Sequence, residues 1–179
     1  MLIDKNKSCL LVIDMQERLL PKMLNRRKIL QNTKILIQSA NILKIPVLLS
    51  EQYPKGLGNT APEIKKFPYS KIIEKTTFSC GKSKKFLKIL KSLNRPQIIV
   101  VGIEAHVCVL QTAADLKNMN YDPFVVLDAI SSRAKHSKDI ANKRLGDYGC
   151  NLVSTEMVVF EWIEDSKNQK FKIISQLIS

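Results

Sequence analysis

Two continuous apolar runs constrain the fold of this chain most strongly: SCLLVID at residues 8–14 and QIIVVG at residues 97–102. A strand exposed on one face alternates apolar and polar residues, whereas a strand covered on both faces of a parallel sheet is apolar throughout. Amphipathic helical patterns follow the runs, over roughly residues 26–43 and 107–119. This alternation predicts βαβ units and a mostly parallel, doubly wound α/β sheet.

Four shorter apolar segments are interpreted as the remaining strands. They are PVLLSE, KIIEK, PFVVLD and CNLVST, which begin at residues 46, 71, 123 and 150. Helices are expected at SKKFLKILKSL, at about residues 138–145 and, once or twice, near the end of the chain. Residues 52–70, rich in Pro, Gly and aromatic side chains, are expected to form a long ordered loop, and loops of that length are often functional. No linker or repeat divides the sequence, so we expect one domain over residues 1–179.

The net charge of +13 raises the question of a nucleic-acid partner. The lysines are spread over many segments, arginine is scarce, and basic residues do not alternate with aromatic ones. A nucleic-acid site usually gathers its basic residues on one face. The sequence therefore favours a solvated, lysine-rich surface and no nucleic-acid partner. Binding through charge alone would weaken steeply with salt and would be indifferent to loss of Cys108.

No apolar run approaches the roughly 20 residues that a transmembrane helix needs, so we expect no membrane partner. The N-terminal stretch superficially resembles a signal peptide, but its apolar part is short, ends at Asp14 and lacks a small-residue cleavage site. Cys9, Cys80, Cys108 and Cys150 have neither CxxC nor zinc-site spacing, which favours free thiols in a reducing compartment. We expect a cytoplasmic protein, with a mitochondrial or other organellar location left open.

The carboxyl ends of the predicted strands are where an open α/β sheet binds its ligands. Asp14 follows an entirely apolar strand, Lys75 ends a short one, and Cys108 follows a buried strand and its turn. A cysteine thiolate is a nucleophile. A carboxylate alone is a weak base for a thiol, but burial raises carboxyl pKa values and a nearby ammonium favours the thiolate. The three groups together could therefore share a proton, at a helix start whose dipole and N–H groups favour an anion.

Each of these residues also has a simpler interpretation. Asp14 alone would be the cap of a turn, Lys75 a surface lysine, and Cys108 a small buried hydrophobic residue. His106 is the nearest alternative base for Cys108. Residues two apart point about 200° away from each other around a helix, so we discount a local Cys–His dyad. His136 lies in a polar loop and is expected at the surface.

The stretches LLVIDMQ, EKTTFS and VVGIEAHVCVLQTAADL, in this order and at these separations, resemble the isochorismatase-like cysteine hydrolase superfamily over nearly the whole chain. PVLLSEQYPKGLG and LDAISSR are similar to the isochorismatase-domain-containing proteins in particular. The resemblance implies a Rossmann-like three-layer αβα sandwich around a six-stranded parallel sheet. It also implies a catalytic triad of Asp14, Lys75 and Cys108, a cis peptide bond between Ile103 and Glu104, and an oxyanion hole made by the N–H groups of Glu104 and Cys108.

The chemistry that this resemblance implies is acyl transfer to water. Asp14 accepts the proton of Cys108 while Lys75 balances the charges. The thiolate attacks an amide-type carbonyl carbon of a small-molecule substrate, and water hydrolyses the thioester. True isochorismatases cleave a vinyl ether without needing the thiol, so Cys108 favours cleavage of a C–N bond. The resemblance implies no particular substrate.

Relatives that hydrolyse nicotinamide carry Asp and His metal ligands after the second strand, where this sequence has Glu51, Gln52 and Tyr53. We therefore expect no metal and no cofactor. The residues expected to bind the substrate are Gln16, Gln52, Tyr53, Phe78 and Ile103. Two alternatives stay open: Tyr53 could instead pack within its loop, and Phe78 could belong to the core.

Other residues are expected to be structural. Asp128 and Arg133 would form an ion pair or a subunit contact, and the remaining cysteines would pack in the core. By analogy with relatives, we expect a homo-oligomer. The main alternative to the hydrolase is a binding or scaffold protein that keeps the fold but has little activity.

Overall fold

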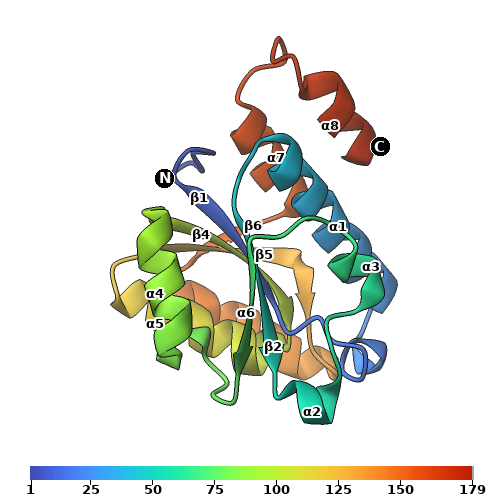
Figure 1. Ribbon diagram of the computed structural model, residues 1–179, viewed down its shortest axis with the longest axis vertical. Helices are drawn as coiled ribbons and strands as arrows, with labels where there is room; N and C mark the ends of the chain where they lie inside the picture. Colours follow the sequence, from blue (N-terminus) through green and yellow to red (C-terminus); the bar gives the residue numbers. More distant parts are fainter. Residues whose placement is uncertain (179) are drawn as a thin grey trace.

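Six parallel strands form one sheet in the computed structural model, which describes residues 1–178. The strand order is β3-β2-β1-β4-β5-β6 (Figure 1). Their bounds are β1 Ser8–Ile13, β2 Val47–Gln52, β3 Lys71–Lys75, β4 Gln97–Ile103, β5 Asp122–Ser131 and β6 Asn151–Val153. The two apolar runs of the sequence form the central pair, β1 and β4. The strand order reverses between them, which makes this pair the switch point where such sheets bind ligands.

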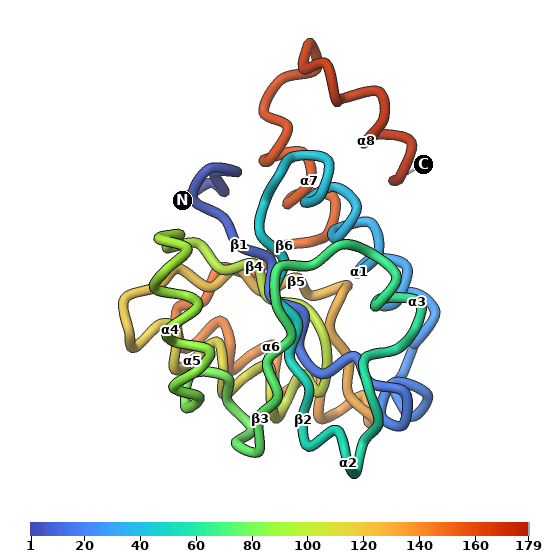
Figure 2. Tube along the Cα trace, viewed as in Figure 1, coloured from blue at the N-terminus to red at the C-terminus, as the bar shows by residue number. Residues whose placement is uncertain are grey.

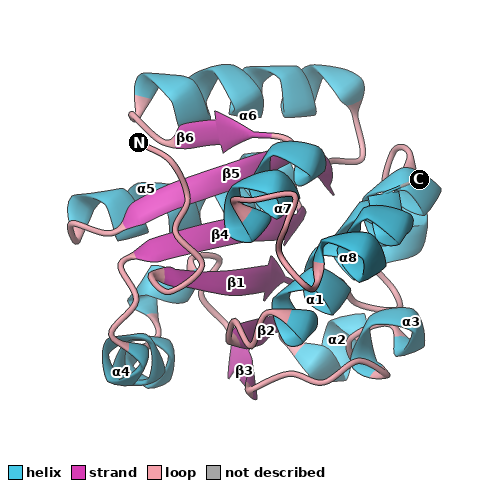
Figure 3. Ribbon diagram, turned by 90° about the horizontal axis from the view of Figure 1, so that it is seen from above, coloured by secondary structure: helices cyan, strands magenta, loops and turns pink. Residues whose placement is uncertain are grey.

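Helices cover both faces of the sheet and make the three layers of an αβα sandwich (Figure 3). The helices are α1 Arg26–Ile42, α2 Pro54–Leu57, α3 Pro62–Lys65, α4 Lys84–Leu93, α5 Leu110–Asn118, α6 Lys135–Asp147, α7 Thr155–Ile163 and α8 Phe171–Ile178. The trace in Figure 2 shows α4 and α5 on one side of the sheet and α1 and α3 on the other. The predicted fold class is confirmed.

The side chains of β1 alternate between two hydrophobic cores, one on each face of the sheet. Leu10 and Val12 belong to the core under α1 and α7, whereas Cys9, Leu11 and Ile13 belong to the core under α4, α5 and α6. All six residues of β1 are buried. A strand with both faces covered needs apolar side chains at every position, which explains the uninterrupted run in the sequence.

Local structure differs from the sequence-based expectation in several segments; β5, for example, continues to Ser131, and α6 begins at Lys135. The long segment 52–70 contains two short helices, α2 and α3, each of which begins at a proline. β6 is shorter than expected because Ser154 is the N-cap of α7, where its hydroxyl accepts the N–H of Met157 at 3.3 Å. A π-helical turn, Ala105–Val109, precedes α5, so the helical backbone starts before residue 107.

Candidate active site

The carboxyl ends of β1 and β3 place Asp14 and Lys75 in direct contact across β2, which lies between those strands. Lys75 Nζ lies 2.7 Å from Asp14 Oδ2, and the two side chains are 1% and 0% exposed. Cys108 lies in the turn after β4 and is also buried. Asp14 raises the pKa of its thiol and Lys75 lowers it, which places the thiol close to both. The fold thus brings together the three residues that the sequence singled out.

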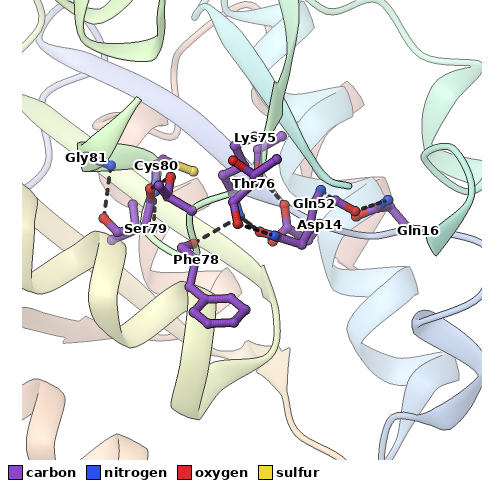
Figure 4. A network of polar contacts seen from close by, with 12 residues as sticks. Asp14, Gln16, Gln52, Lys75, Thr76, Phe78, Ser79, Cys80 and Gly81 are labelled. Atoms are coloured by element: carbon purple, nitrogen blue, oxygen red, sulfur yellow. Dashed lines mark hydrogen bonds and ion pairs between the residues drawn. The ribbon is translucent and has the colours of Figure 1, made fainter. Parts of the chain in front are cut away.

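The ammonium of Lys75 has three protein acceptors. These are Asp14 Oδ2 at 2.7 Å, Gln52 Oε1 at 2.8 Å and the carbonyl oxygen of Phe78 at 3.0 Å (Figure 4). An ammonium carries three N–H donors, so every donor of this buried charge is matched. Burial of a charge is costly unless it is paired and hydrogen-bonded, and Lys75 meets both conditions.

Asp14 is held by backbone as well as by side-chain contacts. Its Oδ1 accepts the hydroxyl of Ser50 at 2.7 Å, and its N–H donates to the Ser50 carbonyl at 3.1 Å. The residue has φ of 50°, a left-handed conformation that aspartate tolerates better than most residues. The carboxylate of Asp14 faces Lys75 and Cys108 instead of capping the turn that follows β1.

Gly102 lets β4 approach β1 immediately before the site. It has φ of 114°, and a Cβ at this position would lie 2.1 Å from the carbonyl oxygen of Ile13. Any other residue would clash with the backbone next to Asp14. The glycine that ends the second apolar run is therefore a steric requirement of the site. The peptide bond that follows Ile103 is cis.

The electrostatics favour a protonated Cys108 in the resting site. Burial raises the pKa of the Cys108 thiol well above its usual range, and the negative charge of Asp14 raises it further, against an opposing effect of Lys75. For Lys75, burial lowers the pKa, but the Asp14 carboxylate and the two nearby thiols more than offset this, and the net pKa is raised. At neutral pH the raised pKa values keep Lys75 an ammonium and Cys108 a thiol.

Comparison with known proteins identifies the family. The isochorismatase domain model matches residues 8–157. This chain belongs to the isochorismatase family. It is 39% identical to isochorismatase domain-containing protein 2 of Danio rerio over 173 residues, which cover 96% of this chain and 87% of the relative.

Solved structures show the same isochorismatase-like fold. The MAR1 ribonuclease of Caenorhabditis elegans is 37% identical and superposes with a TM-score of 0.94, covering 99% of this chain and 92% of that one. The YcaC gene product of Escherichia coli, an octameric hydrolase of unknown specificity, is 26% identical with a TM-score of 0.94, covering 99% of this chain and 89% of that one. The family is one of hydrolases. The residues matched by the family model include Asp14, Lys75 and Cys108.

The residues predicted to bind substrate in this isochorismatase-family chain fall into two groups. Gln16, Gln52 and Ile103 are buried, and the side chains of the two glutamines bond to protein groups. Tyr53 and Phe78 are 54% and 53% exposed. The Phe78 ring points away from the polar network in Figure 4. A cavity of about 500 Å³ adjoins the site, with Tyr53 and Lys75 among its lining residues. Contact of any of the five with a substrate stays a prediction.

Cys80 lies close to Asp14, Lys75 and Cys108, a proximity that sequence reasoning missed by treating Cys80 as a packing residue. Burial above all raises its pKa to about 11, and Asp14, Lys75 and Ser50 are among the groups that act on it. Its N–H donates to Thr112 Oγ1 at 3.0 Å. Thr112 is one helical turn beyond Cys108. The backbone of Cys80 is therefore bonded to the same helical segment that carries Cys108. The signal available in the sequence was that Cys80 lies only five residues after Lys75.

The expected ion pair at Arg133 exists, but its acid is Glu104. Glu104 Oε2 accepts the Nε of Arg133 at 3.1 Å and its backbone N–H at 3.2 Å. Asp128 instead accepts the N–H and the hydroxyl of Thr155 at 2.8 and 2.9 Å, at the start of α7. Asp128 and Arg133 therefore bond within the chain but not to each other, because Asp128 faces α7; a subunit contact at either residue stays a prediction.

His106 and the acidic residues are engaged elsewhere. His106 Nδ1 lies 2.8 Å from Ser132 Oγ, just after the end of β5. Glu51, which precedes Gln52, accepts both the N–H and the hydroxyl of Thr60 at 2.7 Å.

Within residues 1–178, no three His, Cys, Asp or Glu side chains gather as a metal ion would require. None of the helices in that range is long and apolar enough to cross a membrane.

Proposed function

We propose that this isochorismatase-family protein is a cysteine-dependent hydrolase that cleaves the C–N bond of a small amide through a thioester on Cys108. The observation that carries the proposal is the buried Asp14–Lys75 ion pair, which lies close enough to the Cys108 thiol to act on its pKa. A buried ion pair is a poor source of stability, because desolvation offsets its attraction. Its placement against a nucleophile at the switch point of the sheet supports a chemical role.

The proton moves within a site of constant net charge. As Cys108 Sγ attacks the carbonyl carbon of the substrate, the thiol proton passes to Asp14. Asp14 then becomes neutral, and the Lys75 ammonium faces the negative charge that develops on the substrate. The positive charge of Lys75, fixed by its three acceptors, then stabilises the negative charge formed in the transition state. The protonated Asp14 supplies a proton to the leaving amine.

The N–H groups of Glu104 and Cys108 are proposed to hold the oxyanion. The carbonyl of Glu104 accepts the N–H groups of Val107 and Val109 at 3.1 and 3.2 Å, which closes the turn around the nucleophile. N–H groups in the first turn of a helix lack acceptors within that helix and are available to an anion. Hydrolysis of the thioester by water repeats the same cycle, with Asp14 as the base for the water.

Ammonia release from a panel of small primary amides tests this function. We expect activity on at least one neutral amide and a fall to the uncatalysed rate in Cys108→Ala. Cys150→Ala is the matched control, because this thiol is also buried but lies away from the triad, and it should retain activity. Activity that survives in Cys108→Ala would overturn the thioester mechanism, and a panel with no substrate would favour the low-activity scaffold protein.

A ribonuclease is the second candidate, favoured by the net charge of +13 and by the similarity to the nematode protein of that name. Both histidines lie outside the triad. RNA cleavage in which histidines act as the acid–base pair would therefore not need Cys108. Hydrolysis of a fluorescent RNA oligonucleotide by wild type and Cys108→Ala alike would support the ribonuclease. We expect no RNA cleavage.

We also propose that the chain assembles as a homo-oligomer. The support is the octameric state of the Escherichia coli relative, which shares the fold along the whole chain. Light scattering of the purified protein tests it, and a monomer at micromolar concentration would contradict it.

A further inference from the structure

We propose that Gln52 is a positioning residue for Lys75, held in place by Gln16, and that it acts through the triad instead of contacting the substrate. The inference rests on the proposed function, since it concerns the charge that faces Cys108. It differs from the sequence-based expectation that both glutamines bind substrate, and it follows from how their amide groups are bonded.

The side-chain amide of Gln52 is oriented by two protein partners. Its Nε2 donates to the carbonyl of Thr76 at 2.7 Å, and its Oε1 accepts from Lys75 Nζ at 2.8 Å. A carbonyl only accepts and an ammonium only donates. A reversed amide would therefore put its NH₂ group against the ammonium of Lys75 and its oxygen against the carbonyl of Thr76. The neighbours therefore fix Oε1 on the ammonium. Gln52 is also buried, which leaves little of it to touch a ligand.

Gln16 holds the backbone of Gln52 as a neighbouring strand would. The pairing of β1 with β2 ends at Ile13 and Ser50, two residues before Gln52. Beyond that point Gln16 Oε1 accepts the N–H of Gln52 at 2.8 Å, and Gln16 Nε2 donates to its carbonyl at 3.0 Å. Gln16 Nε2 also donates to the carbonyl of Gly58 at 2.6 Å. One side chain thus replaces the missing strand and locks the end of β2.

The consequence is electrostatic. The ionisable groups that face this point are Asp14 after β1, Lys75 at the end of β3, Cys80 before α4 and Cys108 before α5. Gln52 adds a neutral acceptor, so it aims the ammonium of Lys75 without drawing its charge away from Asp14 and Cys108. Loss of this acceptor frees Lys75 to rotate, and the thiolate of Cys108 then forms less readily.

The test is the pH profile of Cys108 alkylation by iodoacetamide, resolved by mass spectrometry, in wild type, Gln52→Met and Gln16→Met. Methionine keeps the length of glutamine but offers no comparable acceptor. We expect the apparent pKa of alkylation in Gln52→Met to rise by about one unit, which slows labelling about tenfold at neutral pH. Gln16→Met should shift it less, and the double variant no further than Gln52→Met, because both act through one contact. Gln111→Met, an exposed glutamine on α5, is the matched control and should leave the profile unchanged.

Three results would overturn the inference. A lower melting temperature with an unmoved alkylation profile would mean a merely structural role. An unmoved profile with a raised KM for an amide would mean that Gln52 contacts the substrate. An additive effect in the double variant would mean that the two glutamines act separately.

The Nζ resonance of Lys75 in a ¹⁵N spectrum separates this inference from the proposed function. It can be assigned by its loss in Lys75→Met. If wild-type Cys108 reacts no faster than an ordinary thiol, the proposed function fails, yet Gln52→Met still decides the contact by shifting or sparing that resonance. A spared resonance would overturn the positioning role.

Discussion

The carboxylate of Asp14 and the ammonium of Lys75 lie 2.7 Å apart and are almost completely sealed from solvent. The two residues are 61 positions apart in sequence, and the strands that deliver them, β1 and β3, are not neighbours in the sheet. Each charge depends on the other, because an unpaired buried charge is far less favourable than a pair.

Removal of one partner of this pair should destabilise the fold. Asp14→Asn leaves the ammonium of Lys75 without its counter-charge, and we expect a loss of about 3–5 kcal/mol in the free energy of unfolding. Urea denaturation measures it. The double variant Asp14→Asn, Lys75→Met should recover part of that loss, because no charge is left buried alone; a further loss would contradict this account.

Alkylation of Cys108 should depend on both partners. The negative charge of Asp14 contributes to the raised pKa of the Cys108 thiol, but in the proposed mechanism Asp14 also accepts the proton of that thiol, and this second role governs reaction at neutral pH. We expect iodoacetamide to label Cys108 before the other three cysteines in wild type, and to do so more slowly in Asp14→Asn and in Lys75→Ala. Peptide mass spectrometry identifies the labelled residue. Equal labelling rates in the three proteins would speak against an activated nucleophile.

Alkaline pH should destabilise the fold through its buried thiols. Burial above all raises the pKa of Cys9 to about 12 and those of Cys80 and Cys150 to about 11, from 9.0. A raised folded-state pKa means stability that is present below pH 9 and is lost as pH rises from 9 towards 11 or 12, at about 1.4 kcal/mol per unit and thiol at most. Denaturation at pH 7 and pH 10.5 should show a smaller alkaline loss in Cys9→Ala than in wild type. Equal losses would rule out a contribution from Cys9.

Substitution of two glycines tests whether β4 must approach β1 closely, with one glycine at that approach and the other as the control. Gly102→Ala would place a Cβ 2.1 Å from the Ile13 carbonyl oxygen at a φ of 114°, and we expect a loss of more than about 3 kcal/mol or no soluble protein. Gly146→Ala, in α6, meets no atom closer than 3.5 Å and should be neutral or stabilising by up to about 1 kcal/mol. Thermal unfolding compares them, and a tolerated Gly102→Ala would show that the two strand ends can separate.

The sequence by itself determined the order of strands and helices, because apolar runs and helical periodicity are local consequences of burial on two faces or one. KIIEK is a strand as predicted, and the runs at residues 8–14 and 97–102 lie at the centre of the sheet. Asp14, Lys75 and Cys108 could be chosen because each lies at a strand end or in the turn beyond it. Their order along the chain and the resemblance to relatives outweighed the simpler interpretation of each residue alone.

Only the tertiary structure decided which side chains meet. A lysine in so basic a chain is usually exposed, yet Lys75 is buried because β2 and β3 deliver it to Asp14 with two further acceptors. Gln16 binds the backbone of Gln52 across 36 positions, and Arg133 pairs with Glu104 while Asp128 turns to Thr155. Contacts of this kind depend on where β1 stops pairing and on which helix covers each strand end, and no local pattern of residues encodes either.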